Sequence, residues 1–212
     1  NVRRLGYAPT DIKKILLSHA HIDHIGGART LKELTGAEIY LGRRDILFVT
    51  ERKDLIGNED GEHTCGDFEP DQLYEDGGQV RLGEIAITTV ASPGHTPGCT
   101  SFFFDVKEKG GRILRCGMHG GVGLNTMSSG YFRTSSLPAT LRDEFAEGLA
   151  RFDRMEVDVC MPSHPNQVEI LSLVDKITEG FNPYVNPQAW HTFLQTRLAK
   201  LHALIEEEST QA

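Results

Sequence analysis

The sequence contains 212 residues, of which 39% are hydrophobic and 25% charged, and its formal net charge is −8. This composition predicts one globular domain over residues 1–212. It also predicts no nucleic-acid partner, because binding to phosphate backbones rests on Lys and Arg. We expect no membrane partner either, because no apolar run approaches the length of a bilayer span.

The N-terminal part of the chain predicts alternating strands and helices. A short apolar run within residues 11–18 is typical of a buried strand. Residues 25–34 predict a helix in which Leu31 and Leu34 face inward and Gly36 ends the helix. A strand, a helix and a polar, glycine-containing loop are predicted next, over residues 38–41, 45–52 and 53–70.

The middle of the chain predicts paired strands. Period-two alternation and turn residues indicate four of them, and the last two form a hairpin. Their predicted ranges are 79–82, 84–91, 100–106 and 112–116. Residues 117–130 are rich in glycine and predict an irregular segment.

The C-terminal part predicts two amphipathic helices around a short strand. Apolar side chains recur every three or four residues in both helices, which is typical of a face turned toward a core. Asn186 and Pro187 mark the start of the second helix, and residues 157–161 predict the strand. The apolar positions are Leu141, Phe145, Leu149 and Phe152 in the first helix and Trp190, Leu194, Leu198, Leu201 and Ile205 in the second. Strands and helices mixed in this way indicate sheets covered by helices, the α/β class.

Four potential metal ligands lie within six positions, just after the first predicted strand. They are His19, His21, Asp23 and His24. In an extended segment, positions two apart point the same way, so His19 and His21 can reach one ion. Asp23 and His24, where the chain turns into a helix, can face a neighbouring ion. Zinc takes imidazole and carboxylate ligands. The alternative is a polar surface turn that contains several histidines by chance, and the buried strand just before the motif argues against it.

Two further histidines follow predicted buried strands. His95 lies in a loop with two Pro and two Gly, which hold it close to the end of the strand over 84–91. His164 comes just after the strand over 157–161. One such histidine could be an ordinary buried core residue, but three strand-end sites in one chain favour a shared metal centre.

These motifs resemble those of the metallo-β-lactamase superfamily. The matching strings are SHAHIDHIGG, SPGHTPGCTSF and PSHPN, in that order. The pattern is most similar to the third subclass of class B β-lactamases, and it implies a four-layer αββα sandwich that holds two zinc ions. The ligands implied by the resemblance are His19, His21 and His95 for the first zinc and Asp23, His24 and His164 for the second.

One departure from the wider superfamily concerns a bridging ligand. Most of its hydrolases, such as glyoxalase II and the lactonases, carry a Gly-Asp step whose carboxylate bridges both metals. The matching stretch here, LRCGMH over residues 114–119, has no carboxylate, which agrees with the third subclass. Cys116 and His119 stay open as alternative ligands. We expect Cys116 to be a small buried hydrophobe and His119 to lie in the pocket wall or on the surface.

A second departure is at the N-terminus. The superfamily fold normally begins with several strands before the first histidine motif, and this sequence begins shortly before His19. The resemblance therefore predicts that these N-terminal strands are missing from the sandwich, which would expose apolar faces. A cleaved or disordered segment, a separate second chain or a truncated gene product would each explain this.

The resemblance implies a dizinc hydrolase in which a metal-bound hydroxide attacks a carbonyl. We favour opening of a β-lactam ring in a small-molecule substrate. Asp23 and His24 would then be catalytic as well as ligating, with Asp23 orienting the nucleophile. Asn125, Ser128 and Ser129 are candidates to hold a substrate carboxylate or oxyanion, although ordinary loop polarity explains them equally well.

Three other functions are compatible with parts of the pattern. A lactonase or thioesterase-like hydrolase would share the fold. A diiron oxidoreductase is disfavoured, because such proteins carry Glu where this chain has His21. A catalytically impaired, vestigial protein would retain the site without turnover. A β-lactamase would be periplasmic or secreted and the other enzymes cytoplasmic, and the sequence does not decide the localisation.

Overall fold

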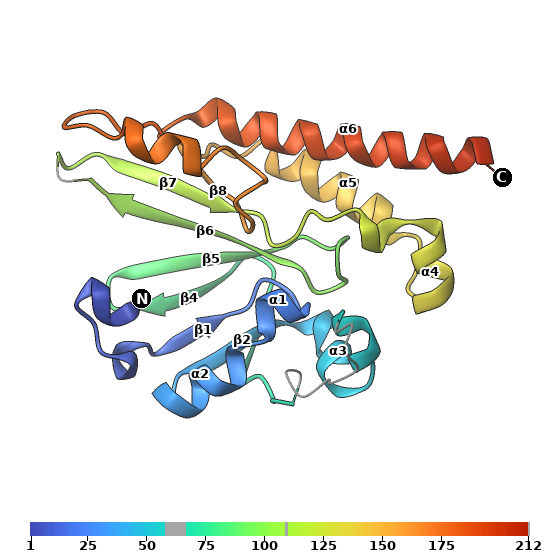
Figure 1. Ribbon diagram of the computed structural model, residues 1–212, viewed down its shortest axis with the longest axis horizontal. Helices are drawn as coiled ribbons and strands as arrows, with labels where there is room; N and C mark the ends of the chain where they lie inside the picture. Colours follow the sequence, from blue (N-terminus) through green and yellow to red (C-terminus); the bar gives the residue numbers. More distant parts are fainter. Residues whose placement is uncertain (58–66, 109, 212) are drawn as a thin grey trace.

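A small parallel sheet forms the first half of the computed structural model, which describes residues 1–57, 67–108 and 110–211 (Figure 1). Its strands are β1 (Lys14–Leu16), β2 (Glu38–Gly42) and β3 (Gln72–Tyr74), in that order across the sheet. Both pairs are parallel. The polar links between these strands contain the helices that cover one face of the sheet.

A second, five-stranded sheet follows. Its strands lie in sequence order, β4 (Gly78–Leu82), β5 (Ile85–Ala91), β6 (Thr100–Lys107), β7 (Ile113–Met118) and β8 (Val159–Met161). The first four strands pair antiparallel, as short hairpin connections require, whereas β8 returns through a helical segment and pairs parallel with β7.

Helices cover the outer face of each sheet. Next to the first sheet lie α1 (Ile22–Ile25), α2 (Ala28–Thr35) and α3 (Ile46–Thr50). Between β7 and β8 lie α4 (Ser129–Ser135) and α5 (Leu141–Phe152), and α6 (Pro187–Gln211) follows β8; α5 and α6 run along the outer face of the second sheet (Figure 1). Short 3-10 helices span Val2–Leu5, Pro9–Asp11, Arg43–Asp45, Lys53–Ile56, Asn125–Met127 and Leu171–Lys176.

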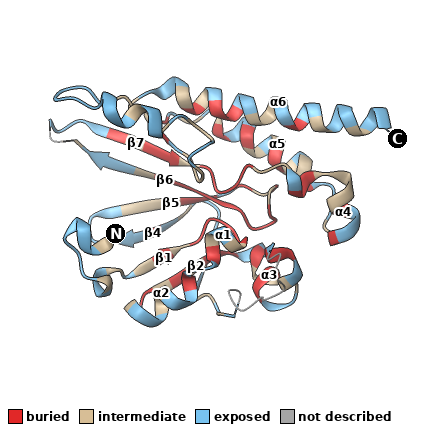
Figure 2. Cartoon of the chain, viewed as in Figure 1, coloured by how far each residue is buried: buried red, intermediate tan, exposed pale blue. Residues whose placement is uncertain are grey.

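Three clusters of buried side chains define the layers. One joins α5 and α6 to the second sheet and contains Phe103, Phe145 and Trp190. Another joins the first sheet to its helices. The third, around Tyr74 and Phe102, lies between the two sheets. Figure 2 shows buried residues on the helix faces that meet the sheets and an exposed outer face on α6. The αββα sandwich is therefore confirmed.

The predicted helix over 25–34 is wrong in one respect. The chain forms two helices, α1 and α2, separated by Gly26 and Gly27, and Gly36 ends α2 in a left-handed conformation with φ of 71°. Helical phase restarts at Ala28, which is buried. At about 100° per residue, Leu34 lies far from the Ala28 face and is 65% exposed. Leu31 does pack against the core, as predicted.

The remaining predicted elements are largely confirmed. All four predicted apolar positions of α5 are buried, and so are Trp190, Leu194 and Leu201 on α6. Neither β3 nor α4 was predicted, and α4 begins at the end of the segment that was expected to be irregular. Residues 58–66 of the predicted loop lie outside the described residues. Within the described chain, no helix has both the length and the apolar character needed to cross a membrane.

Replacement of Trp190 by Ala should lower the free energy of unfolding by about 3–5 kcal/mol, because it removes a buried aromatic side chain and leaves a cavity. The Trp190 indole N–H donates to the Phe152 carbonyl at 3.0 Å. The matched control is Ile205→Ala on the same helix, where the side chain is 38% exposed. Urea denaturation followed by circular dichroism measures both, and equal losses would contradict the assigned core.

Candidate metal centre

The three histidine motifs converge where the loops after β1, β5 and β8 meet. These loops border a cavity of about 550 Å³. His19, His21, Asp23, His95 and His164 all contribute to its wall. The ends of these strands thus bring together residues separated by more than 140 positions along the chain.

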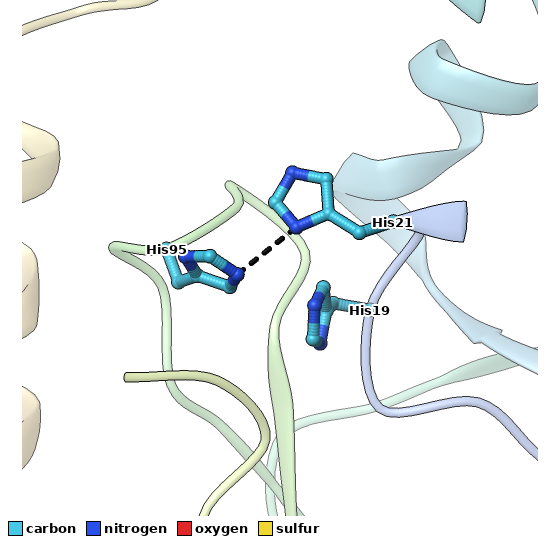
Figure 3. A group of neighbouring side chains, drawn as sticks. All are labelled: His19, His21 and His95. Carbon is cyan, nitrogen blue, oxygen red and sulfur yellow. Dashed lines mark hydrogen bonds between the residues drawn. The ribbon is translucent and has the colours of Figure 1, made fainter. Parts of the chain in front are cut away.

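His19, His21 and His95 form the first cluster (Figure 3). Their potential ligand atoms all lie within 4.8 Å of one another. His21 Nδ1 is 2.9 Å from His95 Nε2. The Nε2 atom of His19 is buried and has no hydrogen-bond partner. A buried polar atom without a partner is costly, so a cation at this position would satisfy it.

Backbone carbonyls fix the ring orientations of two of these histidines. Nδ1 of His19 lies 2.8 Å from the Gly120 carbonyl, and Nδ1 of His95 lies 2.9 Å from the Gly123 carbonyl. A carbonyl oxygen only accepts, so each Nδ1 carries the proton and donates. Each Nε2 therefore presents its lone pair to the cavity, the arrangement common in metal-binding histidines.

Burial keeps these imidazoles neutral. It lowers the pKa of His21 to about 3 and that of His95 to about 4. Burial also lowers the pKa of His19, and the neighbouring histidines lower it further. Neutral imidazole is the form that binds metal. Three such donors in one wall of a cavity fit a zinc ion with an open fourth position.

Asp23, His24 and His164 form the second cluster. Asp23 Oδ2 lies 3.5 Å from His24 Nε2 and 3.4 Å from His164 Nε2, and the two Nε2 atoms are 3.2 Å apart. Ser18 Oγ is 2.9 Å from His24 Nδ1 and helps to orient that ring. Ligand atoms around a tetrahedral zinc with bonds of about 2.0–2.1 Å lie roughly 3.3 Å apart. His24 and Asp23 also group with His19, so the two clusters are adjacent.

Asp45 ties two of the loops together. Its buried carboxylate accepts hydrogen bonds from the Ala20 amide at 2.9 Å, the Thr96 hydroxyl at 2.7 Å and the Gly98 amide at 2.5 Å. Burial raises the pKa of Asp45 to about 6, while these three donors oppose the rise. The carboxylate thereby sets the position of the first histidine motif relative to the His95 loop.

Glycines let the loop after β7 approach the first cluster. A Cβ atom at Gly121 would lie 2.8 Å from His95 Cδ2, and one at Gly123 would lie 2.7 Å from His95 Cε1. Both distances are too short for a side chain. The glycine-rich composition of this segment thus has a specific role, because its carbonyls must reach the histidine rings.

The three predicted substrate-binding residues lie in different places. Asn125 lies in the cavity wall. Ser128 and Ser129 are not among the described residues that line it. Ser128 caps α4 by accepting from the Tyr131 amide at 3.1 Å, and Ser129 donates its hydroxyl to Glu208 at 2.6 Å. The Ser128 hydroxyl thus caps α4, and the Ser129 hydroxyl joins α4 to α6.

Neither alternative ligand lines the cavity. Cys116 is buried in β7 beside β6 and β8, which confirms the prediction of a small buried hydrophobe. His119 was expected in the pocket wall or on the surface, and that expectation is wrong. Its buried ring packs edge-on against Phe145 and Phe152, with centroids 5.9 and 5.3 Å away. Met118, at the position of the missing carboxylate, packs between the sheets.

Several residues of the site had no sequence signal. Asp45 and Arg197 lie outside the histidine motifs, and both reach the site through tertiary contacts. Tyr131 and Gln167 also line the cavity. No motif spacing singles out any of them.

A family model described as the metallo-beta-lactamase superfamily matches residues 2–117, more than half of the sequence. The chain belongs to the metallo-β-lactamase superfamily. The match includes the first histidine motif and the His95 loop. In this chain, His19, His21 and His95 are placed so that they could hold a metal ion.

Two curated proteins are similar to this chain over part of their length. A probable metallo-hydrolase of Burkholderia pseudomallei is 31% identical over 104 residues, covering 48% of this chain and 34% of the relative. Hydroxyacylglutathione hydrolase GloC of Haemophilus influenzae is 28% identical over 136 residues, covering 63% of each protein. The chain thus spans less than two thirds of the length of either relative.

Among solved structures, the metallo-β-lactamase fold of this chain is similar to that of BJP-1, a subclass B3 metallo-β-lactamase of Bradyrhizobium japonicum. The TM-score is 0.84 at 24% sequence identity. The match covers 100% of this chain and 79% of that chain. At this identity the likeness establishes the fold, and it agrees with the two-sheet architecture.

Asp45→Asn should weaken both the fold and zinc binding. Both carboxylate oxygens accept hydrogen bonds, so an amide NH₂ group must face at least one donor. We expect the free energy of unfolding to fall by about 1–3 kcal/mol. Zinc affinity should also fall, measured by competition with a chromogenic chelator. Asp143→Asn, on the surface of α5, serves as the control. Unchanged zinc affinity in Asp45→Asn would contradict the positioning role.

Proposed function

We propose that this superfamily member is a dizinc hydrolase that opens β-lactam rings. The observation that carries the proposal is the pair of adjacent three-ligand clusters in one cavity, without a bridging carboxylate among the described residues. His19, His21 and His95 would hold one zinc. Asp23, His24 and His164 would hold the other.

Zinc bound at these positions would lower the pKa of a water molecule and polarise a carbonyl group. The residues of the chain supply orientation and proton handling. Asp23 carries a half-exposed carboxylate within 3.5 Å of two imidazole nitrogens, where it can accept a hydrogen bond from the attacking nucleophile. Asn125, in the cavity wall, can donate its side-chain amide to the oxygen of the carbonyl under attack.

A cyclic amide is favoured as the substrate for two reasons. The donor set resembles that of the third subclass of class B β-lactamases, in which no protein carboxylate bridges the ions. The fold is also similar to BJP-1, which is itself named as a subclass B3 metallo-β-lactamase. These two features support β-lactam opening over the other carbonyl chemistries of the superfamily.

Thioester hydrolysis is the second candidate. It is favoured by the likeness to GloC, which is named as a hydroxyacylglutathione hydrolase. A thioesterase would use the same cavity, ligands and Asp23. The two candidates differ in the substrate, so a direct assay separates them.

The decisive experiment measures turnover of nitrocefin and of a hydroxyacyl thioester of glutathione by zinc-loaded protein. We expect nitrocefin hydrolysis that stops after dialysis against a chelator and returns when zinc is added. Thioester turnover alone would replace the β-lactam proposal with the second candidate. Hydrolysis that persists in protein shown to be metal-free would overturn both.

His164→Ala should reduce zinc stoichiometry from two ions to about one per chain, because two ligands rarely retain a catalytic zinc. The first cluster does not include His164 and should keep its ion. Mass spectrometry under native conditions gives the count directly. The control is His202→Ala, an exposed histidine on α6. Two zinc ions retained in His164→Ala would contradict the ligand assignment.

A further inference from the structure

Arg197 brings a positive charge to the wall of the cavity that holds the two ligand clusters. It lies on α6, and its neighbours in the wall, Asn166 and Gln167, come from the loop that follows β8. None of the three motifs contains this arginine.

Arg197 differs from the other half-buried arginines of the described chain. Arg52 pairs with Asp54 at 2.7 Å, Arg115 pairs with Asp105 at 3.2 Å and Arg142 pairs with Glu208 at 2.5 Å. Within the same described residues, Arg197 forms no ion pair with a carboxylate. It is therefore the one half-buried guanidinium of that set whose counter-charge the described chain does not supply.

The contacts of Arg197 hold its guanidinium in place while leaving donors free. Its Nη2 donates to the Gln167 carbonyl at 3.2 Å, and the group lies over the Phe193 ring, 5.2 Å from the centroid. Its Nε is buried without a hydrogen-bond partner. Neither donor of Nη1 has a hydrogen-bond partner among the described residues, and this nitrogen is not among the buried ones, so it can donate to a ligand.

A partly desolvated cation with unused donors is destabilising unless an anion binds to it. Burial lowers the pKa of Arg197, because loss of hydration disfavours the charged guanidinium. A planar guanidinium fixed by a ring and a carbonyl is pre-organised for two parallel hydrogen bonds to a carboxylate. The same cavity wall thus combines a site for carbonyl chemistry with a site for an acidic group.

We propose that Arg197 binds a carboxylate of the substrate, so that the enzyme acts on acids that also carry the scissile carbonyl. This inference rests on the proposed hydrolase function. The sequence suggested Ser128 and Ser129 for binding an anion, but their hydroxyls are engaged with α4 and Glu208. The inference assigns that role to Arg197 on α6 instead. Arg197 would select the substrate class rather than take part in bond cleavage.

The first arm of the test compares a carboxylate-bearing β-lactam with its methyl ester. Arg197→Met should lower kcat/KM for the acid by about 10- to 100-fold, as expected for loss of a charged hydrogen bond. The same variant should change kcat/KM for the ester by less than about threefold. Arg197→Lys should recover part of the loss. The control is Arg154→Met, an exposed arginine outside the cavity wall. Equal losses for acid and ester would overturn the inference while leaving the hydrolase proposal intact.

The second arm measures binding without turnover. Succinate is titrated into zinc-loaded protein, and the Nε–Hε resonance of Arg197, identified by its absence in the conservative variant Arg197→Lys, is followed by ¹⁵N NMR. We expect a saturable shift with succinate and none with its dimethyl ester. A resonance that does not respond to succinate would overturn the inference, even if Arg197→Met fails to fold. A response in a protein that hydrolyses neither assay substrate would support anion binding and reject the hydrolase proposal.

Discussion

The buried carboxylate of Asp45 is the interaction on which the site depends. It accepts hydrogen bonds from the loop that carries His19 and His21 and from the loop that carries His95. These loops belong to different sheets, and the carboxylate adds three hydrogen bonds to the other contact there, the Thr100 amide donating to the Ser18 carbonyl at 2.8 Å. The Asp45 side chain therefore helps to hold His19 and His21 at a set distance from His95.

The histidine cluster is itself a source of instability that a cation would remove. His19 Nε2 is buried without a partner, and several neutral imidazoles are held close together in a partly dry wall. Carbonyls of the glycine-rich loop accept from Nδ1 of His19 and of His95, but the inner nitrogen of His19 keeps no partner. Ion binding would thus contribute to folding as well as to chemistry, because the ion binds only the assembled site.

Sequence patterns predicted sheets covered by helices and the six candidate ligands because both are encoded locally, and the family resemblance supplied the four-layer order. Strand alternation, helical periodicity and strand-end histidines can each be read within a short window. Leu34 was misplaced because two glycines reset the phase of the helix. The hydrogen bond from Ser129 to Glu208 had no local signal because the two residues lie 79 positions apart. Asp45 and Arg197 escaped prediction for the same reason, since their roles exist only once distant loops meet.

The close contact between β2 and the His95 loop has a consequence for redesign of the enzyme. A Cβ atom at Gly42 would lie 1.8 Å from the Gly98 carbonyl, and one at Gly98 would lie 2.4 Å from the Asp45 amide. The backbones around residues 42–45 and 95–98 therefore fit each other only as a matched pair. Recombination between related genes with a crossover between them would join incompatible backbones, whereas exchange of both segments together would keep the fit.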